Sequence, residues 1–275
     1  MTDLRPTLTF RGVRGSLPVS GADTNRHGGH TLCIDISAGD RSVVLIDGGT
    51  GVIRLNGEGT PSGPTDYHVF LTHYHWDHIQ GLLFFRPLFD PDNHFTFYGH
   101  QWDGMSSREA IEGALRPPWF PISIQDTAAG KAYVTLEEAT FELGSLKVTA
   151  APLRHPQGVT AYRIDGPTRS VVVATDCERG ELDADERLRR LASGADILVH
   201  DAQYSPEEYE DHYVGWGHST WAQAAQAARE SGVGQLVLVS HDPARTDDEI
   251  DALVKRAAEE FPNTTAAFEG LSFAL

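Results

Sequence analysis

The sequence predicts one α/β domain in which two β-sheets are flanked by helices. Apolar or alternating segments of strand length occur at both ends of the 275-residue chain, with helical segments between and after them. Polar residues follow the same end of several buried strands, where sites in α/β proteins are commonly built. No linker, internal repeat or low-complexity tract divides the sequence, so residues 1–275 are expected to form a single domain.

The composition is that of a globular chain with strong negative charge. Hydrophobic residues make up 40% and charged residues 22%, and the formal net charge is −17. Nucleic-acid binders usually carry a basic footprint, so a long tRNA-like partner is disfavoured. Cys33 and Cys177 are too few for a disulfide framework and are expected in the core, with a single bridge as the alternative. No signal-like segment follows Met1 and no run reaches the roughly 18 apolar residues of a membrane span, so we expect a cytoplasmic protein.

The first part of the chain predicts strands that are separated by glycine-rich and proline-rich loops. Leu8 to Val13 alternates apolar and polar residues, as in a half-buried strand. Residues 31–37 and 42–46 predict a hairpin with Gly39-Asp40 in its turn. A further buried strand is predicted at residues 67–71.

Two helices and one irregular segment are predicted next. Ile79 to Phe85 is apolar enough for a buried helix, and Ser106 with Glu109 offers a capping box for the helix after it. The following segment, Arg116 to Pro121, contains three prolines and cannot be regular structure. Its Trp119-Phe120 pair belongs either to a packed loop or to a lid over a ligand.

Strands and helices alternate in the rest of the chain. Short strands are predicted at residues 95–98, 146–149, 161–164, 171–174, 197–199 and 236–239. Helices are predicted at residues 184–192, 220–230 and 246–260, and the second of these is rich in alanine, which suits close packing on a sheet.

The N-terminal loop contains residues that can approach a ligand. Arg11, Arg14 and Arg26 can form a local basic patch for a small phosphate. His27 and His30 can reach a neighbouring site, although a surface role is the favoured interpretation for both.

The stretch with the most chemical information is His73-Tyr74-His75-Trp76-Asp77-His78, directly after the strand at 67–71. Imidazoles at alternating positions of an extended backbone point the same way, so His73 and His75 can share one ion. Asp77 and His78 follow where the chain can turn and serve a second ion. Surface or capping roles do not explain such clustering. Asp47, in a glycine-rich turn, is either a turn residue or a partner that orients a ligating imidazole.

Three later strand ends supply further candidate ligands. His155, Asp176 and His241 each follow a predicted strand, and each alone would be explained as a cap or a hydrogen-bond partner. With the first stretch they complete two ligand sets bridged by Asp176. The first set is His73, His75 and His155, and the second is Asp77, His78 and His241.

This series of residues resembles the signature of the metallo-β-lactamase superfamily. His73-x-His75-x-Asp77-His78 is followed in order by His155, Asp176 and His241. The resemblance runs from about Phe10 to the C-terminus and implies a four-layer αββα sandwich with a two-metal site along one edge of the sheets. It implies two divalent metal ions as cofactors, with Zn²⁺ as the expected ion and Mn²⁺ or iron as alternatives.

Two other segments are similar to one branch of that superfamily. Gly217-His218-Ser219-Thr220 resembles the His-Ser-Thr motif of RNase Z and related phosphodiesterases, and His200-Asp201-Ala202 lies where that branch carries an acidic residue before alanine. The resemblance implies that His218 contacts the phosphate or protonates the leaving oxygen, while Asp201 orients His218. From the residues alone, a helix-entry role for His218 and a capping role for Asp201 are favoured.

The function implied is a metal-dependent phosphodiesterase that uses a metal-activated hydroxide on a small or cyclic nucleotide-like diester. Asp77 would hold that hydroxide and bind the second ion, which makes it catalytic together with His218 and Asp201. The chain shows no basic, glycine-rich arm like that of RNase Z, which argues against tRNA processing. Alternatives are a hydrolase of carboxylic esters, thioesters or lactams, and a redox or non-catalytic metal-binding protein. A homodimer is expected by similarity.

Overall fold

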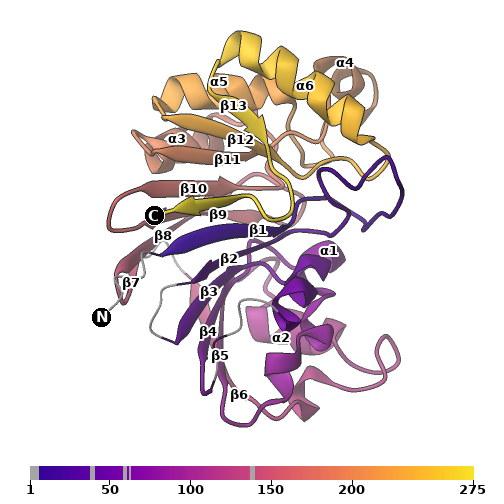
Figure 1. Cartoon of the computed structure of the whole chain (residues 1–275), viewed down its shortest axis with the longest axis vertical. Coiled ribbons are helices and arrows are strands. Elements are labelled where there is room, and N and C mark those ends of the chain that lie inside the picture. The colour runs from indigo at the N-terminus through magenta and orange to yellow at the C-terminus, as the bar shows by residue number, and fades with distance from the viewer. Residues whose placement is uncertain (1–5, 38–40, 58–60, 62, 137–139) are drawn as a thin grey trace.

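Two mixed seven-stranded sheets pack face to face in the computed structural model, which describes residues 6–37, 41–57, 61, 63–136 and 140–275 (Figure 1). The strands of the first sheet are β1 (Thr7–Gly12), β2 (Cys33–Ser37), β3 (Ser42–Ile46), β4 (Asp66–Phe70), β5 (His94–His100), β6 (Gly130–Leu136) and β14 (Ser272–Ala274). Their order is β14-β1-β2-β3-β4-β5-β6, and β3 to β6 run parallel.

The second sheet repeats this plan. Its strands are β7 (Thr140–Leu143), β8 (Leu146–Leu153), β9 (Val159–Asp165), β10 (Ser170–Ala174), β11 (Ile197–Asp201), β12 (Gln235–Val239) and β13 (Thr264–Ala266). Their order is β13-β12-β11-β10-β9-β8-β7, and β10 to β13 run parallel. Parallel strands end at the same edge of a sheet, so each sheet gathers several strand ends at one place.

Helices cover the outer face of each sheet (Figure 1). On the second sheet these are α3 (Leu182–Ala192), α5 (Trp221–Ser231) and α6 (Asp247–Glu260), with the short α4 (Pro206–Glu208) and a π-helical turn, η5 (Tyr209–Tyr213), nearby. On the first sheet these are α1 (Trp76–Ile79), α2 (Ser107–Ala114) and the 3₁₀ turns η1 (Thr50–Asn56), η2 (Leu82–Phe84), η3 (Arg86–Phe89) and η4 (Ile124–Asp126). The four-layer αββα arrangement implied by the sequence is confirmed.

Apolar side chains fill the spaces between the layers. Phe10, Phe70 and Tyr162 are fully buried between the two sheets. Ala224 and Ala228 of α5 are fully buried against the second sheet, where their small side chains allow the helix to lie close to the strands. This packing fixes the sheet edges on which the site is built.

The helix predicted from Ile79 to Phe85 is wrong in its bounds. Helix α1 begins at Trp76 and ends at Ile79, and a 3₁₀ turn follows from Leu82. Gly81 lies between them against the glycine-rich turn, because a Cβ added to it would be 2.1 Å from the carbonyl oxygen of Gly49. The backbone N–H of Gly81 donates to the carbonyl of Gly48 at 3.0 Å, so the chain leaves the helix to pack on that turn.

Several local predictions are confirmed and some lie outside the described residues. The hairpin of β2 and β3 pairs in antiparallel register, whereas its predicted Gly39-Asp40 turn falls outside the described part of the chain. Strand β11 extends to Asp201, two residues beyond its predicted end, because it stays paired with β12. The short strands β13 and β14 have too few residues to show a periodic pattern and were not predicted.

The two cysteines and the proline-rich segment are now placed. Cys33 and Cys177 are both buried and free, so the core role is confirmed and the alternative bridge is wrong. Phe120 packs edge-on against Phe84 at 5.3 Å between ring centroids, which makes its part of the segment a packed loop, while Trp119 is 69% exposed.

Among the described residues, no helix is long and apolar enough to cross a membrane.

Candidate metal centre

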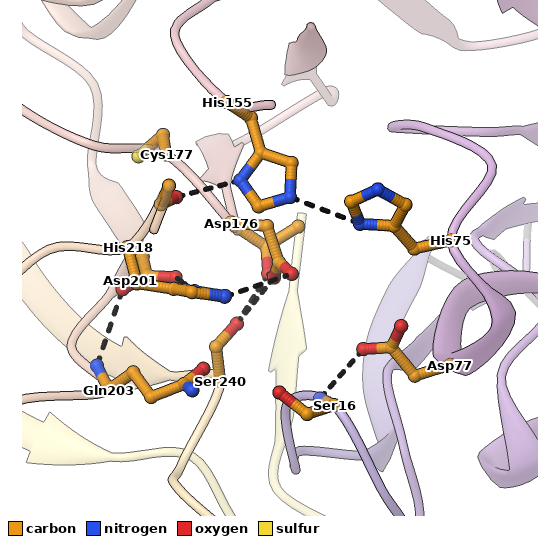
Figure 2. A network of polar contacts seen from close by, with 12 residues as sticks. Ser16, His75, Asp77, His155, Asp176, Cys177, Asp201, Gln203, His218 and Ser240 are labelled. Atoms are coloured by element: carbon orange, nitrogen blue, oxygen red, sulfur yellow. Dashed lines mark hydrogen bonds and ion pairs between the residues drawn. The ribbon is translucent and has the colours of Figure 1, made fainter. Parts of the chain in front are cut away.

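All of the predicted ligands except His241 meet where strands of both sheets end, and Figure 2 shows His75, Asp77, His155 and Asp176 among them. His73 follows β4, His155 follows β8, Asp176 follows β10 and His241 follows β12. Asp201 is the last residue of β11. Residues more than 160 positions apart in the sequence therefore come to one edge of the sandwich.

Three imidazoles form the first ligand group. Potential ligand atoms of His73, His75 and His155 all lie within 4.8 Å of one another. His155 Nε2 is 3.2 Å from His75 Nδ1, whereas His73 Nε2 is buried and has no hydrogen-bond partner among the described residues. Burial lowers the pKa of His73 well below 6.5 and that of His155 to about 4, so both are neutral, as metal ligation requires. An orphaned buried nitrogen beside two other imidazoles fits a bound cation.

A second group joins His73 and His78 to Asp176, again within 4.8 Å. His78 Nε2 is 3.2 Å from Oδ2 of Asp77 and 3.2 Å from Oδ2 of Asp176. Burial lowers the pKa of His78, but the carboxylates of Asp77, Asp176 and Asp47 outweigh burial and raise that pKa well above 6.5. Three buried carboxylates around one imidazole leave excess negative charge, which a divalent cation would neutralise.

His241 lies outside both groups. Its Nε2 is 3.0 Å from the carbonyl oxygen of Ala267, and burial lowers its pKa to about 3. The N-terminal segment fixes its backbone, because His241 N–H donates to Val13 and its carbonyl accepts from Gly15, both at 3.1 Å. Its role as a ligand of a second ion stays a prediction.

His27 is not the surface residue that the sequence favoured. It is 8% exposed, and its ring packs edge-on against that of His241 at 5.6 Å between centroids. Its Nε2 is 3.0 Å from Asp251 on α6. This contact could not be predicted from the sequence, because it joins segments that are more than 200 residues apart. His30 lies nearer the surface and contacts Thr50 at 3.2 Å.

The predicted basic patch in the N-terminal loop is also wrong. Arg14 is fully buried, and its guanidinium donates to the backbone carbonyls of Gly28, Asp242 and Arg245. The other two arginines are neutralised by carboxylates, Arg11 by Asp35 and Arg26 by Asp248 and Asp251. These three cations are therefore occupied by the protein itself and do not form an open phosphate site.

Each imidazole is held from behind by a hydrogen bond. His78 Nδ1 is 2.7 Å from Asp47 Oδ2, which is the orienting contact considered for Asp47 from the sequence. His75 Nε2 is 3.2 Å from Gln157 Oε1, and His155 Nδ1 donates to the carbonyl of Gly217 at 2.8 Å. Such partners fix the tautomer and the direction of a ligating ring. Gln157 was not anticipated, because nothing in its local sequence points to His75.

Unusual backbone conformations gather at this site. Among the described residues, seven other than glycine have positive φ, and five of those seven contact the ligand cluster or belong to it. These five are Ser16 (63°), Asp47 (61°), Gln157 (64°), Asp176 (49°) and Ser240 (58°). Each such residue costs roughly 1–2 kcal/mol relative to ordinary backbone. Their concentration indicates that the surrounding fold holds these side chains in place for a purpose other than stability.

His218 and Asp201 form a buried pair beside the ligands. His218 Nδ1 is 2.7 Å from Asp201 Oδ2, and His218 Nε2 is 3.9 Å from Asp176 Oδ2. Burial lowers the pKa of His218, but the carboxylates of Asp201 and Asp176 outweigh it and raise that pKa to about 9. Asp201 is fully buried and also accepts from the backbone N–H of Ser219 at 2.8 Å. The predicted pairing of His218 with Asp201 is present, and the catalytic roles of both residues stay predictions beside the helix-entry and capping alternatives.

The comparisons with known proteins agree with this geometry. Residues 43–241 match the β-lactamase superfamily domain. The chain belongs to the β-lactamase superfamily. A ribonuclease BN from Escherichia coli O6:K15:H31 (strain 536 / UPEC) is 28% identical in an alignment that covers 72% of this chain and 78% of that protein.

Solved structures support the fold assignment within the superfamily. The metallo-β-lactamase fold protein YhfI from Bacillus subtilis superposes with a TM-score of 0.73 at 22% identity, covering 98% of this chain and 99% of that chain. A diphosphatase from the PhnP family gives a TM-score of 0.70 at 20% identity, covering 98% of each chain. At these identities the likeness shows the metallo-β-lactamase fold alone.

In this β-lactamase superfamily chain, Glu178 organises the segment that precedes His218. Its side chain is buried, and its carboxylate accepts hydrogen bonds from Tyr209 Oη at 2.7 Å and from the backbone N–H groups of Gly215 at 2.7 Å and Gly217 at 3.1 Å. Gly217 in turn binds His155 through its carbonyl. Its φ of 93° and its closeness to the His155 ring, which a Cβ would reach at 2.2 Å, suit glycine alone. Glu178 is thus a positioning residue that the sequence did not reveal.

Replacing Glu178 with glutamine should loosen this segment. The amide nitrogen would face backbone N–H donors, and leaving a buried donor unsatisfied costs about 1–3 kcal/mol. We expect a lower melting temperature, faster hydrogen exchange in residues 209–217 and reduced turnover with unchanged metal content. Glu181→Gln, at an exposed glutamate three positions later, is the matched control. Unchanged exchange in residues 209–217 of Glu178→Gln would contradict the positioning role.

Proposed function

We propose that this protein is a metal-dependent phosphodiesterase that hydrolyses small or cyclic nucleotide-like diesters. The observation that carries the proposal is the His218–Asp201 pair, in which a proton-bearing imidazole lies 3.9 Å from Asp176 in the candidate metal centre. A protonated group placed there is suited to a reaction that releases an alkoxide. The similarity to a ribonuclease supports chemistry at phosphorus.

We propose two divalent ions, with Zn²⁺ as the expected metal and Mn²⁺ or iron as alternatives. His73, His75 and His155 would hold one ion, and Asp77, His78 and His241 the other, with Asp176 shared between them. Bound ions of this kind supply a nucleophile at neutral pH and neutralise charge that develops on the phosphoryl group. Two observations support this arrangement: His73 Nε2 is buried without a hydrogen-bond partner among the described residues, and three carboxylates surround His78.

The chain's own residues supply orientation and the proton. Asp201 accepts from Nδ1–H of His218, which leaves Nε2–H of the same imidazole directed toward Asp176 and the substrate. In the proposed reaction, His218 donates this proton to the departing alkoxide oxygen. Asp77 is held by the backbone N–H of Ser16 at 2.8 Å, which turns its carboxylate toward His78 and the reacting atoms.

A small substrate fits the charge of the molecule better than a long nucleic acid. The net charge is −17, and the arginines of the N-terminal loop are occupied by carbonyls and carboxylates. A polyanion gains affinity mainly by pairing its phosphates with free Lys and Arg, which this loop does not provide. We also propose a cytoplasmic protein that acts as one domain over residues 1–275 and assembles as a homodimer.

A hydrolysis panel with the metal-loaded protein tests the function. The substrates are an aryl phosphodiester, cyclic mononucleotides, a lactam and a thioester, with His75→Ala as the inactive control. We expect turnover of at least one phosphodiester and none by the variant. Turnover of the thioester or the lactam, with every phosphodiester left intact, would replace the proposal with the carbon-ester hydrolase alternative.

A further inference from the structure

A groove of about 200 Å³ opens directly beside the candidate metal centre. His73 and His75 form part of its wall, so a group bound in the groove would be continuous with a phosphate held at the centre. Gln157, which contacts His75 from behind, also lines it.

Much of the remaining wall is apolar and preformed. Tyr74, Trp102, Met105 and Pro156 line the groove. Trp102 and Met105 exchange two backbone hydrogen bonds at 3.1 and 2.8 Å, which fix the tight turn between them, and the Trp102 ring stacks on His100 at 5.2 Å between centroids. Met105 is 50% exposed and offers a polarisable thioether to a ligand. Flat rings with a thioether suit an uncharged ring better than a hydrated, charged group.

The charge of the groove excludes a second phosphate. No lysine or arginine occurs among the described residues that line it, and Asp103 adds a carboxylate. A diester phosphate bound at the metal centre would have its single charge compensated there. Apart from the histidines and Tyr74, the only ionisable acid or base among the described lining residues that a further phosphate would meet is Asp103, whose carboxylate repels it.

We propose that this groove receives the uncharged, ring-bearing alcohol portion of the substrate, such as a nucleoside, and rejects a second phosphate. This inference rests on the phosphodiesterase function proposed above and narrows it to diesters with one phosphate. The groove then separates a nucleotide-like diester from a polynucleotide, in which a further phosphate lies on each side of the scissile one.

Binding of product-like ligands tests the groove independently of turnover. Isothermal titration of the zinc-loaded protein would compare methyl phosphate, thymidine 5′-monophosphate and thymidine 3′,5′-bisphosphate. We expect the monophosphate of thymidine to bind about tenfold or more tightly than methyl phosphate, because its ring system is buried in the groove. We expect the bisphosphate to bind more weakly than thymidine 5′-monophosphate.

Charge variants test whether Asp103 causes the preference for ligands with one phosphate over ligands with two. Asp103→Lys should reduce the preference for one phosphate over two by about three- to tenfold. Asp92→Lys makes the same charge change just before the other end of β5 and should leave the preference unchanged. Asp103 has a φ of 49°, which asparagine tolerates better than lysine, so Asp103→Asn serves as a milder variant if the lysine variant does not fold.

The outcomes are distinguishable. Equal binding of methyl phosphate and thymidine 5′-monophosphate would overturn the proposed role of the groove. The same holds if the bisphosphate binds more tightly than thymidine 5′-monophosphate, or if none of the three ligands binds. Turnover of thymidine 5′-(4-nitrophenyl phosphate) is measured in parallel. The expected binding order without any phosphodiester turnover would sustain the groove as a ligand site and overturn only the proposed function.

Discussion

Replacing His218 with alanine should lower kcat for phosphodiester hydrolysis by about 10²- to 10⁴-fold, which is the usual contribution of a positioned general acid. The imidazole is 7% exposed and is hydrogen-bonded to Asp201, so it is fixed rather than mobile. Metal content should stay unchanged, because His218 belongs to neither of the two proposed ligand sets. Stopped assays on an alkyl phosphodiester, with metal analysis of the same sample, measure both quantities.

The pH profile separates a general acid from a merely structural histidine. His218 has a pKa raised to about 9, so its protonated form persists at neutral pH and is lost as the pH rises through that value. Asp201→Asn removes a carboxylate that raises this pKa. We therefore expect the alkaline fall in turnover to begin at a lower pH in Asp201→Asn than in the wild type.

Two controls accompany these variants. His94→Ala removes an exposed histidine at the start of β5 and should leave turnover unchanged. A diester with a very acidic leaving group needs little protonation, so His218→Ala should impair its hydrolysis less than that of an alkyl diester. Equal impairment of both diesters would remove the acid role and leave His218 with a structural one.

The sequence was informative where chemistry and local spacing coincide. His73 to His78 places four potential ligands in six residues, and each of the later candidates follows a buried strand that its apolar run reveals. Capping boxes at Ser106 and Thr220 predicted helix starts that the structure confirms, because these hydrogen bonds join residues only three apart. Such signals do not require knowledge of the tertiary fold.

Residues whose roles depend on contacts between distant segments of the chain could not be predicted from the sequence. Gln157 contacts His75 because the two sheets bring separate loops together, and Glu178 contacts Gly217 because β10 and β11 are neighbours in the second sheet. The interpretation of His27 as a surface residue failed for the same reason, since its burial depends on α6 and on the loop after β12. Arg14 was misjudged in the opposite direction. It was predicted to help bind a phosphate, but its guanidinium donates to backbone carbonyls of the protein itself.

Removing the metal should lower the thermal stability of the protein as well as its activity. The centre contains four histidines and three carboxylates in close contact, and a cation that binds only the folded state stabilises it by about 2.7 kcal/mol at a hundredfold excess over its Kd. For a chain of this size that corresponds to a melting temperature about 5–10 °C lower after chelation. Differential scanning calorimetry before and after chelation, and after re-addition of Zn²⁺, measures the change.

His73→Ala should lower stability and activity as chelation does, and added metal should not restore them. His73 Nε2 is buried and has no hydrogen-bond partner among the described residues. His73 also belongs to both the three-imidazole group and the group with His78 and Asp176. We expect reduced metal content and a fall in kcat of about 10²-fold or more, since bound metal contributes several kcal/mol to transition-state stabilisation. His94→Ala again serves as the histidine control. If His73→Ala keeps the full metal content of the wild type, then the cluster at His73, His75 and His155 is not a metal site, and the buried nitrogen needs another explanation.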